Sequence, residues 1–196
     1  MVGDDLADAF RTGGAYLSQA VDWALGERAV APDTTGAAAV TAGIRLDDAL
    51  RGYLAEQGSK RMNRDDLPRL VLSSMQLRLT AHTLAGLHHI RPHAMPNARG
   101  DPPARQDDPA RAALRGAAAA LAAFYGQVAA ALARPGGPVP AAPPGITTDA
   151  LALGPVAGRP HLMWVREHLY HLLGNTGTIT GPAGRLAELR HTPWWR

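Results

Sequence analysis

Eighteen uncharged residues lie between Arg115 and Arg134, in the stretch "RGAAAALAAFYGQVAAALAR". This length approaches the roughly 20 apolar residues that a helix needs to cross a bilayer. However, most of these residues are alanine, which is nearly neutral for membrane insertion. The strongly apolar side chains recur every three or four residues, at Leu121, Phe124, Val128 and Leu132. One such stripe on a cylinder of small residues predicts a helix packed closely within a bundle, with a transmembrane helix as the alternative.

Two segments nearer the N-terminus also have a helical period. Residues 4–25 place five apolar side chains on one face, namely Leu6, Phe10, Leu17, Val21 and Leu25. In residues 34–58 the spacing predicts an apolar face that consists of Ile44, Leu50, Tyr53 and Leu54, with Leu46 at its edge. Gly58 is the expected end of this second helix, because glycine accommodates the backbone conformation that follows a helix.

A third helix, expected over residues 63–87 with Asn63 as its N-cap, has two apolar rows. One row is Leu70, Leu77 and Leu84, and the other is Leu72, Met75 and Leu79. A helix that is apolar on two sides lies either at the centre of a bundle or at an oligomer interface. We prefer the central position and keep the interface as the alternative.

The C-terminal half begins after a proline-rich linker, residues 90–109, that has no periodicity. Asp107 or Asp108 before Pro109 is a favourable helix start. A further helix over residues 158–175 has the stripe Leu162, Val165, Leu169 and Leu172, ends at Gly174 or Asn175, and precedes a short last helix, "GPAGRLAELRH". The sequence therefore predicts an all-α bundle of five to six helices with long Pro/Gly-rich loops. It forms one domain, 1–196, with three helices in 1–89 and the others in 110–196.

The sequence lacks the usual motifs of enzymes and of nucleic-acid binding. The chain has no cysteine, which excludes disulfides and thiolate chemistry, and no phosphate loop, nucleophile elbow or His-Glu-x-x-His motif. The net charge is +3, without a basic cluster. Ser73 and Ser74 fall within the third helix, where we expect packing or a hydrogen bond to the backbone. We therefore predict no catalytic residue, no cofactor and no nucleic-acid partner.

The helix after residue 158 has the most chemically interesting group of side chains, a band beside its apolar stripe that includes His161. The candidate ligand-binding residues in this band are Trp164, His168 and His171. An indole supplies an apolar wall, and imidazoles supply donors for an anion. His168 and His171 are one turn apart, as shared metal ligands can be, but two histidines do not make a site, and we predict no metal. Glu167 falls outside the band, and an ordinary helix surface is the alternative.

Two neighbouring stretches, "RLDDALRGYLAEQGSKR" (Arg45–Arg61) and "LPRLVLSSMQLRLTAHTLAGL" (Leu67–Leu87), carry a resemblance to a known family. They resemble the non-spanning helices near the C-terminal end of fusaric-acid-resistance (FUSC) proteins, which belong with the aromatic acid exporters. The resemblance covers residues 45–87. It implies a cytoplasmic helical region attached to transmembrane bundles, and it carries no binding residue over to this chain.

The sequence and the resemblance together lead to one functional expectation and one alternative. The expectation is a non-catalytic cytoplasmic domain of, or associated with, a FUSC-like exporter of aromatic acids, located at the inner face of the cell membrane. Its partners would be an exporter segment or subunit, a second copy of the chain, and anionic lipid through the tail residues Trp194 and Trp195. The alternative for the tail is that one or both indoles fold back and cover a groove of the bundle. The alternative is a free-standing soluble helical protein that binds a small aromatic or anionic ligand.

Overall fold

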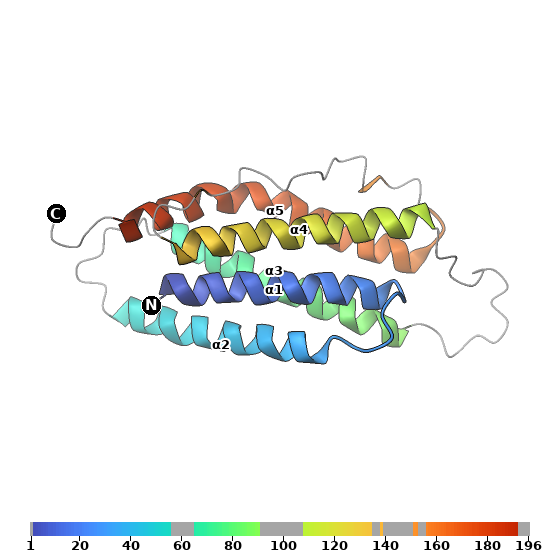
Figure 1. Cartoon of the computed structure of the whole chain (residues 1–196), viewed down its shortest axis with the longest axis horizontal. Helices are drawn as coiled ribbons and strands as arrows, with labels where there is room; N and C mark the ends of the chain where they lie inside the picture. The colour runs from blue at the N-terminus through green and yellow to red at the C-terminus, as the bar shows by residue number, and fades with distance from the viewer. Residues whose placement is uncertain are drawn as a thin grey trace.

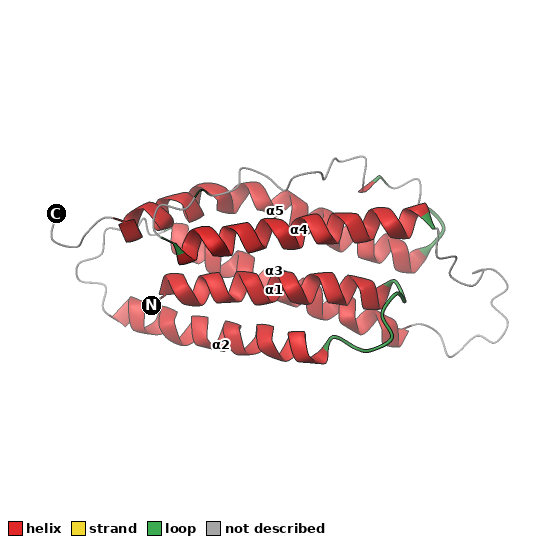
Figure 2. Cartoon of the chain, viewed as in Figure 1, coloured by secondary structure: helices red, strands yellow, loops and turns green. Residues whose placement is uncertain are grey.

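Helices make up almost all of the chain that can be described. The computed structural model describes residues 2–55, 65–90, 108–134, 138, 151–152 and 156–191. These residues contain five helices and no strand: α1 (Val2–Ala24), α2 (Asp33–Ala55), α3 (Asp66–Ile90), α4 (Pro109–Ala133) and α5 (Pro160–His191). Figure 2 shows this all-helical character, which confirms the predicted fold class.

Four of the helices form a ring, and the fifth lies outside it. α1 packs mainly against α3 and α4, and α5 closes the ring by packing against both of these helices. α2 packs on the outer side of α1 and touches α3 only slightly. In Figure 1, α1 and α3 run in one direction, whereas α2, α4 and α5 run in the opposite direction. The neighbours α4 and α5 are therefore parallel.

Two adjacent glycines allow α1 to approach both of its main neighbours. A β-carbon on Gly13 would lie 2.9 Å from Cδ2 of Leu77 in α3. A β-carbon on Gly14 would lie 3.2 Å from the carbonyl oxygen of Ala122 in α4. The predicted apolar face of this helix is confirmed, because every one of its residues is completely buried: Leu6, Phe10, Leu17, Val21 and Leu25.

α4 is a core helix of the bundle, and its predicted apolar stripe is confirmed. Its large apolar side chains, Leu121, Phe124, Val128 and Leu132, are completely buried. The ring of Tyr125 stacks on Phe10 of α1 with 5.7 Å between the ring centroids. Asp108 is the N-cap and accepts a hydrogen bond of 3.0 Å from the Ala110 backbone N–H, as one of the two predicted starts requires.

By length and composition, α4 also has what a membrane-crossing helix needs. It is the one such helix in the described part of the chain, with a mean hydropathy of 1.5 over its most apolar window. Half of that window is buried inside the bundle. The core helix of a water-soluble bundle has the same combination of length and hydropathy, so these two properties alone do not define a membrane span.

The face that we predicted for α2 is correct only in part. Ile44 and Leu54 are 57% and 51% exposed, whereas Leu50 and Tyr53 are partly buried against the core. The buried residues of this helix are Gly36, Ala39, Ala42 and Leu46. The Tyr16 side chain of α1 lies against Gly36, where a β-carbon would be 3.1 Å from the Tyr16 ring. Small residues therefore make much of the contact with α1, because they permit a close approach. The expected caps Gly58 and Asn63 lie outside the described residues.

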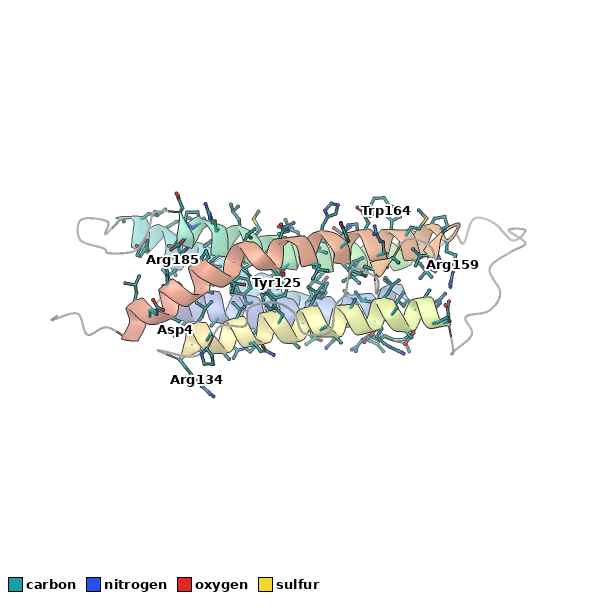
Figure 3. The ribbon with its side chains drawn as sticks, turned by 90° about the horizontal axis from the view of Figure 1, so that it is seen from above. Asp4, Tyr125, Arg134, Arg159, Trp164 and Arg185 are labelled. Carbon is teal, nitrogen blue, oxygen red and sulfur yellow. The ribbon has the colours of Figure 1, made fainter. Side chains whose placement is uncertain are left out.

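α5 continues where we predicted an end. A single helix passes through Gly174, Asn175 and Pro182 and replaces the two shorter helices expected from the sequence. The buried stripe that begins with Leu162 continues along the same side through Thr176, Ile179, Ala183 and Leu186. Burial of this stripe offsets the poor helix propensity of glycine and proline. Figure 3 shows that the helix bends toward its C-terminal end, where Arg185 lies.

Two ion pairs hold α5 near its opposite ends. Near its C-terminal end, Arg185 donates two hydrogen bonds of 2.7 Å to the Asp66 carboxylate at the start of α3. Just before its N-terminal end, Arg159 donates to the Asp108 carboxylate at the start of α4, with one bond of 3.1 Å and a shorter one. Figure 3 shows Arg159 and Arg185 toward the two ends of the helix. These pairs fix the position of α5 beside α3 and α4.

Candidate functional site

The outer side of α3 is an exposed apolar row. Leu72, Met75 and Leu79 are 58%, 43% and 48% exposed, and we call these three residues the α3 face. The other predicted row of this helix, Leu70, Leu77 and Leu84, is completely buried. The preferred interpretation of α3 as a helix covered on both sides is therefore wrong. The ring closes without using the second row, which leaves the row available for another molecule.

A shallow concavity lies between the α3 face and α5. It has a volume of about 390 Å³. Its lining residues are Leu72, Met75, Gln76, Leu79, Thr80 and Thr83 of α3 and His168 of α5. Apart from the edge formed by His168, no side chain that lines it carries a charge. The concavity therefore favours a largely apolar occupant.

The apolar surface continues from the α3 face toward α2. Met75 also lines a small gap between the two helices together with Gly43 and Asp47 of α2 and Arg78 of α3. Ile44 follows Gly43 in the chain and is more than half exposed. The exposed apolar side chains of α2 and α3 therefore lie on neighbouring helices, with Asp47 and Arg78 at the gap between them.

Two of the three predicted ligand-binding residues lie close together. The rings of Trp164 and His168 have centroids 5.4 Å apart, and Nδ1 of His168 lies 2.8 Å from the carbonyl oxygen of Trp164. A backbone carbonyl accepts hydrogen bonds, so Nδ1 carries the proton and Nε2 faces other contacts. Trp164 is 56% exposed, and Figure 3 shows it projecting from the N-terminal half of α5. His168 connects this indole to the concavity on α3.

The third predicted residue, His171, makes other contacts. Its Nε2 lies 3.2 Å from the Glu167 carboxylate, and its ring is edge-on to Tyr170 at 6.4 Å. The placement of Glu167 away from the histidines is therefore wrong, because residues four apart on a helix are neighbours. His171 does not line the concavity, and its side chain is 68% exposed.

The histidine that could complete a metal site from α3 lies elsewhere. Nδ1 of His82 is 3.4 Å from the Tyr16 hydroxyl of α1, and Tyr16 lies against α2. Within the described ranges, no group of three or more histidine and acidic side chains could hold a metal ion. His88 and His89 have no described side chains, and His93 lies outside the described residues.

The buried polar side chains of α3 and α4 take part in the packing of the core. Ser74 Oγ donates a hydrogen bond of 2.8 Å to the Val71 carbonyl, as predicted for a serine within a helix. Ser73 is buried at the same level of α3. Burial raises the pKa of the Tyr125 phenol to about 12, and the neighbouring Ser73 hydroxyl opposes this rise in part. The phenol therefore remains protonated at neutral pH.

The fold and the surface define a class: an all-α bundle whose most distinctive external feature is an exposed apolar face on α3. Comparisons with models of known families, with curated protein sequences and with solved structures give no match to this chain. Any functional assignment must therefore come from the surface chemistry described above and from the short resemblance over residues 45–87.

Proposed function

We propose that this protein is a non-catalytic helical module that works by binding another polypeptide through the α3 face. The observation that supports this most strongly is the exposure of Leu72, Met75 and Leu79 on a helix whose opposite side is completely buried. Exposed apolar patches of this kind are costly in water and mark interaction surfaces when they are contiguous. Helical grooves bordered by apolar residues at helical spacing commonly accept a helix.

The cellular setting in this proposal comes from the resemblance. We propose that the module is cytoplasmic, works at the inner face of the cell membrane, and belongs to or associates with a FUSC-like exporter of aromatic acids. The stretches that carry the resemblance, residues 45–87, include about half of α2 and nearly all of α3. The α3 face lies within those stretches, which supports its use as an interaction surface, whereas Val40 and Ile44 of α2 lie just before them.

Site-specific photo-crosslinking in cells of the native host tests the proposal. A benzophenone amino acid is placed at position 79 on the α3 face, or at Gln127 on the exposed side of α4 as the control. We expect a crosslinked polypeptide from position 79 and none from position 127. The exporter association requires that the product pellet with membranes. A product in the soluble fraction alone contradicts the association, and identical products at both positions contradict the docking face.

The concavity beside His168 supports a second candidate function, the binding of a small aromatic or anionic ligand. Leucine and methionine side chains offer a wall for a ring, and His168 with Thr80 and Thr83 offers polar groups at the edge. Calorimetry with a panel of aromatic acids measures this binding. Equal binding by wild type and the His168→Ala/His171→Ala variant contradicts a site at these histidines.

A further inference from the structure

We infer that the polypeptide bound by the α3 face is a second copy of this chain, in an antiparallel two-fold dimer. This inference rests on the proposed docking function and specifies its partner. The α3 face lines the concavity between α3 and α5, so the apolar row and the hollow form one continuous patch. In an isologous dimer the two copies contribute the same patch, so an apolar row can pack against its own counterpart. The α3 face of each copy then packs against the α3 face of the other.

The amount of apolar surface is appropriate for such a dimer. Side chains from three helices contribute to it or border it: Val40, Ile44, Leu72, Met75, Leu79 and Trp164, each between 42% and 58% exposed. Together they expose on the order of 500 Å² per copy, and a stable interface buries about 800 Å² per partner. The polar residues that line the concavity, among them Gln76 and Thr83, add to this surface.

The charges around the patch are compatible with an identical partner. On α2, Arg51 pairs with Asp48 at 2.9 Å. On α5, Glu167 lies 2.8 Å from Arg166 and 3.2 Å from His171. These charges are paired within one chain, and the two charged residues beside Met75, Asp47 and Arg78, have opposite signs. A facing copy therefore meets both signs of charge and not an excess of one.

The two-fold axis determines which residues meet. The α3 face extends from Leu72 to Leu79, so its centre lies beside Gln76, which also lines the concavity. In an antiparallel arrangement, Leu72 of one copy lies opposite Leu79 of the other. Gln76 then lies near its own counterpart. The wild-type chain contains no cysteine, so one introduced cysteine reports this contact without ambiguity.

Two solution measurements test the dimer. Sedimentation equilibrium of the wild type at micromolar concentrations should give twice the 20.6 kDa chain mass. Leu79→Glu should weaken association about a hundredfold, because it buries a charge opposite Leu72 of the other copy, yet remain helical because position 79 is half exposed. Gln127→Glu adds the same charge on the exposed side of α4 and should remain dimeric. A wild type that is monomeric throughout overturns the inference.

Cysteine crosslinking supplies a readout that does not depend on the glutamate variants. Under mild oxidation Gln76→Cys should form a covalent dimer, whereas Gln127→Cys should not. Equal crosslinking of both variants, or none at position 76, overturns the antiparallel dimer. The benzophenone experiment separates this failure from failure of the proposed function. A product of twice the chain mass supports the second copy, a different polypeptide retains docking but contradicts the dimer, and no product contradicts both.

Discussion

Asp66 and Arg185, separated by more than a hundred residues in the sequence, join the start of α3 to the last third of α5 through two hydrogen bonds of 2.7 Å. The Asp66 side chain is only 4% exposed, whereas Arg185 is half exposed. The hydrogen bonds from Arg185 hold the pKa of Asp66 below its usual value, although burial opposes this. The pair therefore positions the bent part of α5 and makes its attachment sensitive to acid.

Arg185→Gln should lower the melting temperature by a few degrees at neutral pH, because a buried carboxylate loses its cationic partner. The lowered pKa of Asp66 means that the stabilising effect of the pair is present above the ordinary aspartate value of about 4 and is lost as the pH falls below it. Thermal melts should thus show different melting temperatures for variant and wild type at neutral pH, and this difference should disappear at acidic pH. Arg11→Gln removes an exposed pair within α1 and should leave the melting temperature unchanged.

Asp108 contributes to stability both as an N-cap and as an ion-pair partner, and two substitutions should separate these contributions. Its pKa is lowered to about 2, first by the hydrogen bond from Arg159 and then by the bond from the Ala110 N–H, against the effect of burial. Asp108→Asn keeps a capping side chain but loses the charge, so it should cost about 1–2 kcal/mol at neutral pH. Urea denaturation should show this cost shrinking as the pH falls from about 4 through 2.

Asp108→Ala completes the comparison, because alanine removes both the charge and the cap. It should cost about 1 kcal/mol more than Asp108→Asn, and this extra cost should persist in acid. Equal stability of the two variants at all pH values would show that the capping bond contributes little.

Gly14→Ala and Gly116→Ala should have effects of opposite sign. At Gly14 the added β-carbon meets a backbone carbonyl of α4 at 3.2 Å, so α1 and α4 must separate, at a cost of about 1–2 kcal/mol. At Gly116 no atom lies within 4 Å, and alanine should stabilise α4 by about 0.5–1 kcal/mol. Chemical denaturation of the two variants measures the difference directly. Stabilisation by both substitutions would contradict the close α1–α4 contact.

The purified chain should remain in solution without detergent, with a helical circular dichroism spectrum. The reason is that the large apolar side chains of α4 are used inside the bundle, so its outer side offers mainly small residues to a bilayer. Fractionation of expressing cells, followed by washing of the membranes with high salt and then carbonate, tests this. Protein that remains in the membranes after both washes would contradict this prediction.

The tail "TPWWR" should contribute to any contact with anionic lipid, since tryptophan favours the membrane–water interface. Flotation with anionic liposomes should recover less of a chain that ends at Thr192 than of the full chain. Neutral liposomes provide the control for charge. Equal recovery of both chains would exclude the tail as an anchor.

The parts of the fold that were predictable are those where large apolar residues recur at helical spacing. The buried faces of α1 and α4 belong to this kind, and the Asp108–Pro109 start has a local capping signal. The face of α2 was not predictable from hydrophobicity, because this helix packs through Gly36, Ala39 and Ala42. α5 passes through Pro182 because tertiary burial outweighs local propensity, and the spacing of its leucines says nothing about that balance.

The candidate site was predictable only within single helices. The second row of α3 was visible in the sequence, but its exposure depends on which helices close the ring. The proximity of His168 to the α3 face depends on the antiparallel packing of α3 and α5, which no local pattern reveals. The Glu167–His171 pair, by contrast, follows from spacing alone and could have been found.

The stacking of Phe10 on Tyr125 has a consequence for synthesis on the ribosome. The α1 core side chains lack their α4 partners until more than a hundred further residues have been made, which takes on the order of ten seconds. During that interval α1 can pair only with α2 and α3, and part of its apolar surface stays open to chaperones or to wrong partners. Folding of this protein is therefore completed late, after α4 emerges, so a nascent chain halted before Pro109 should be sensitive to proteases.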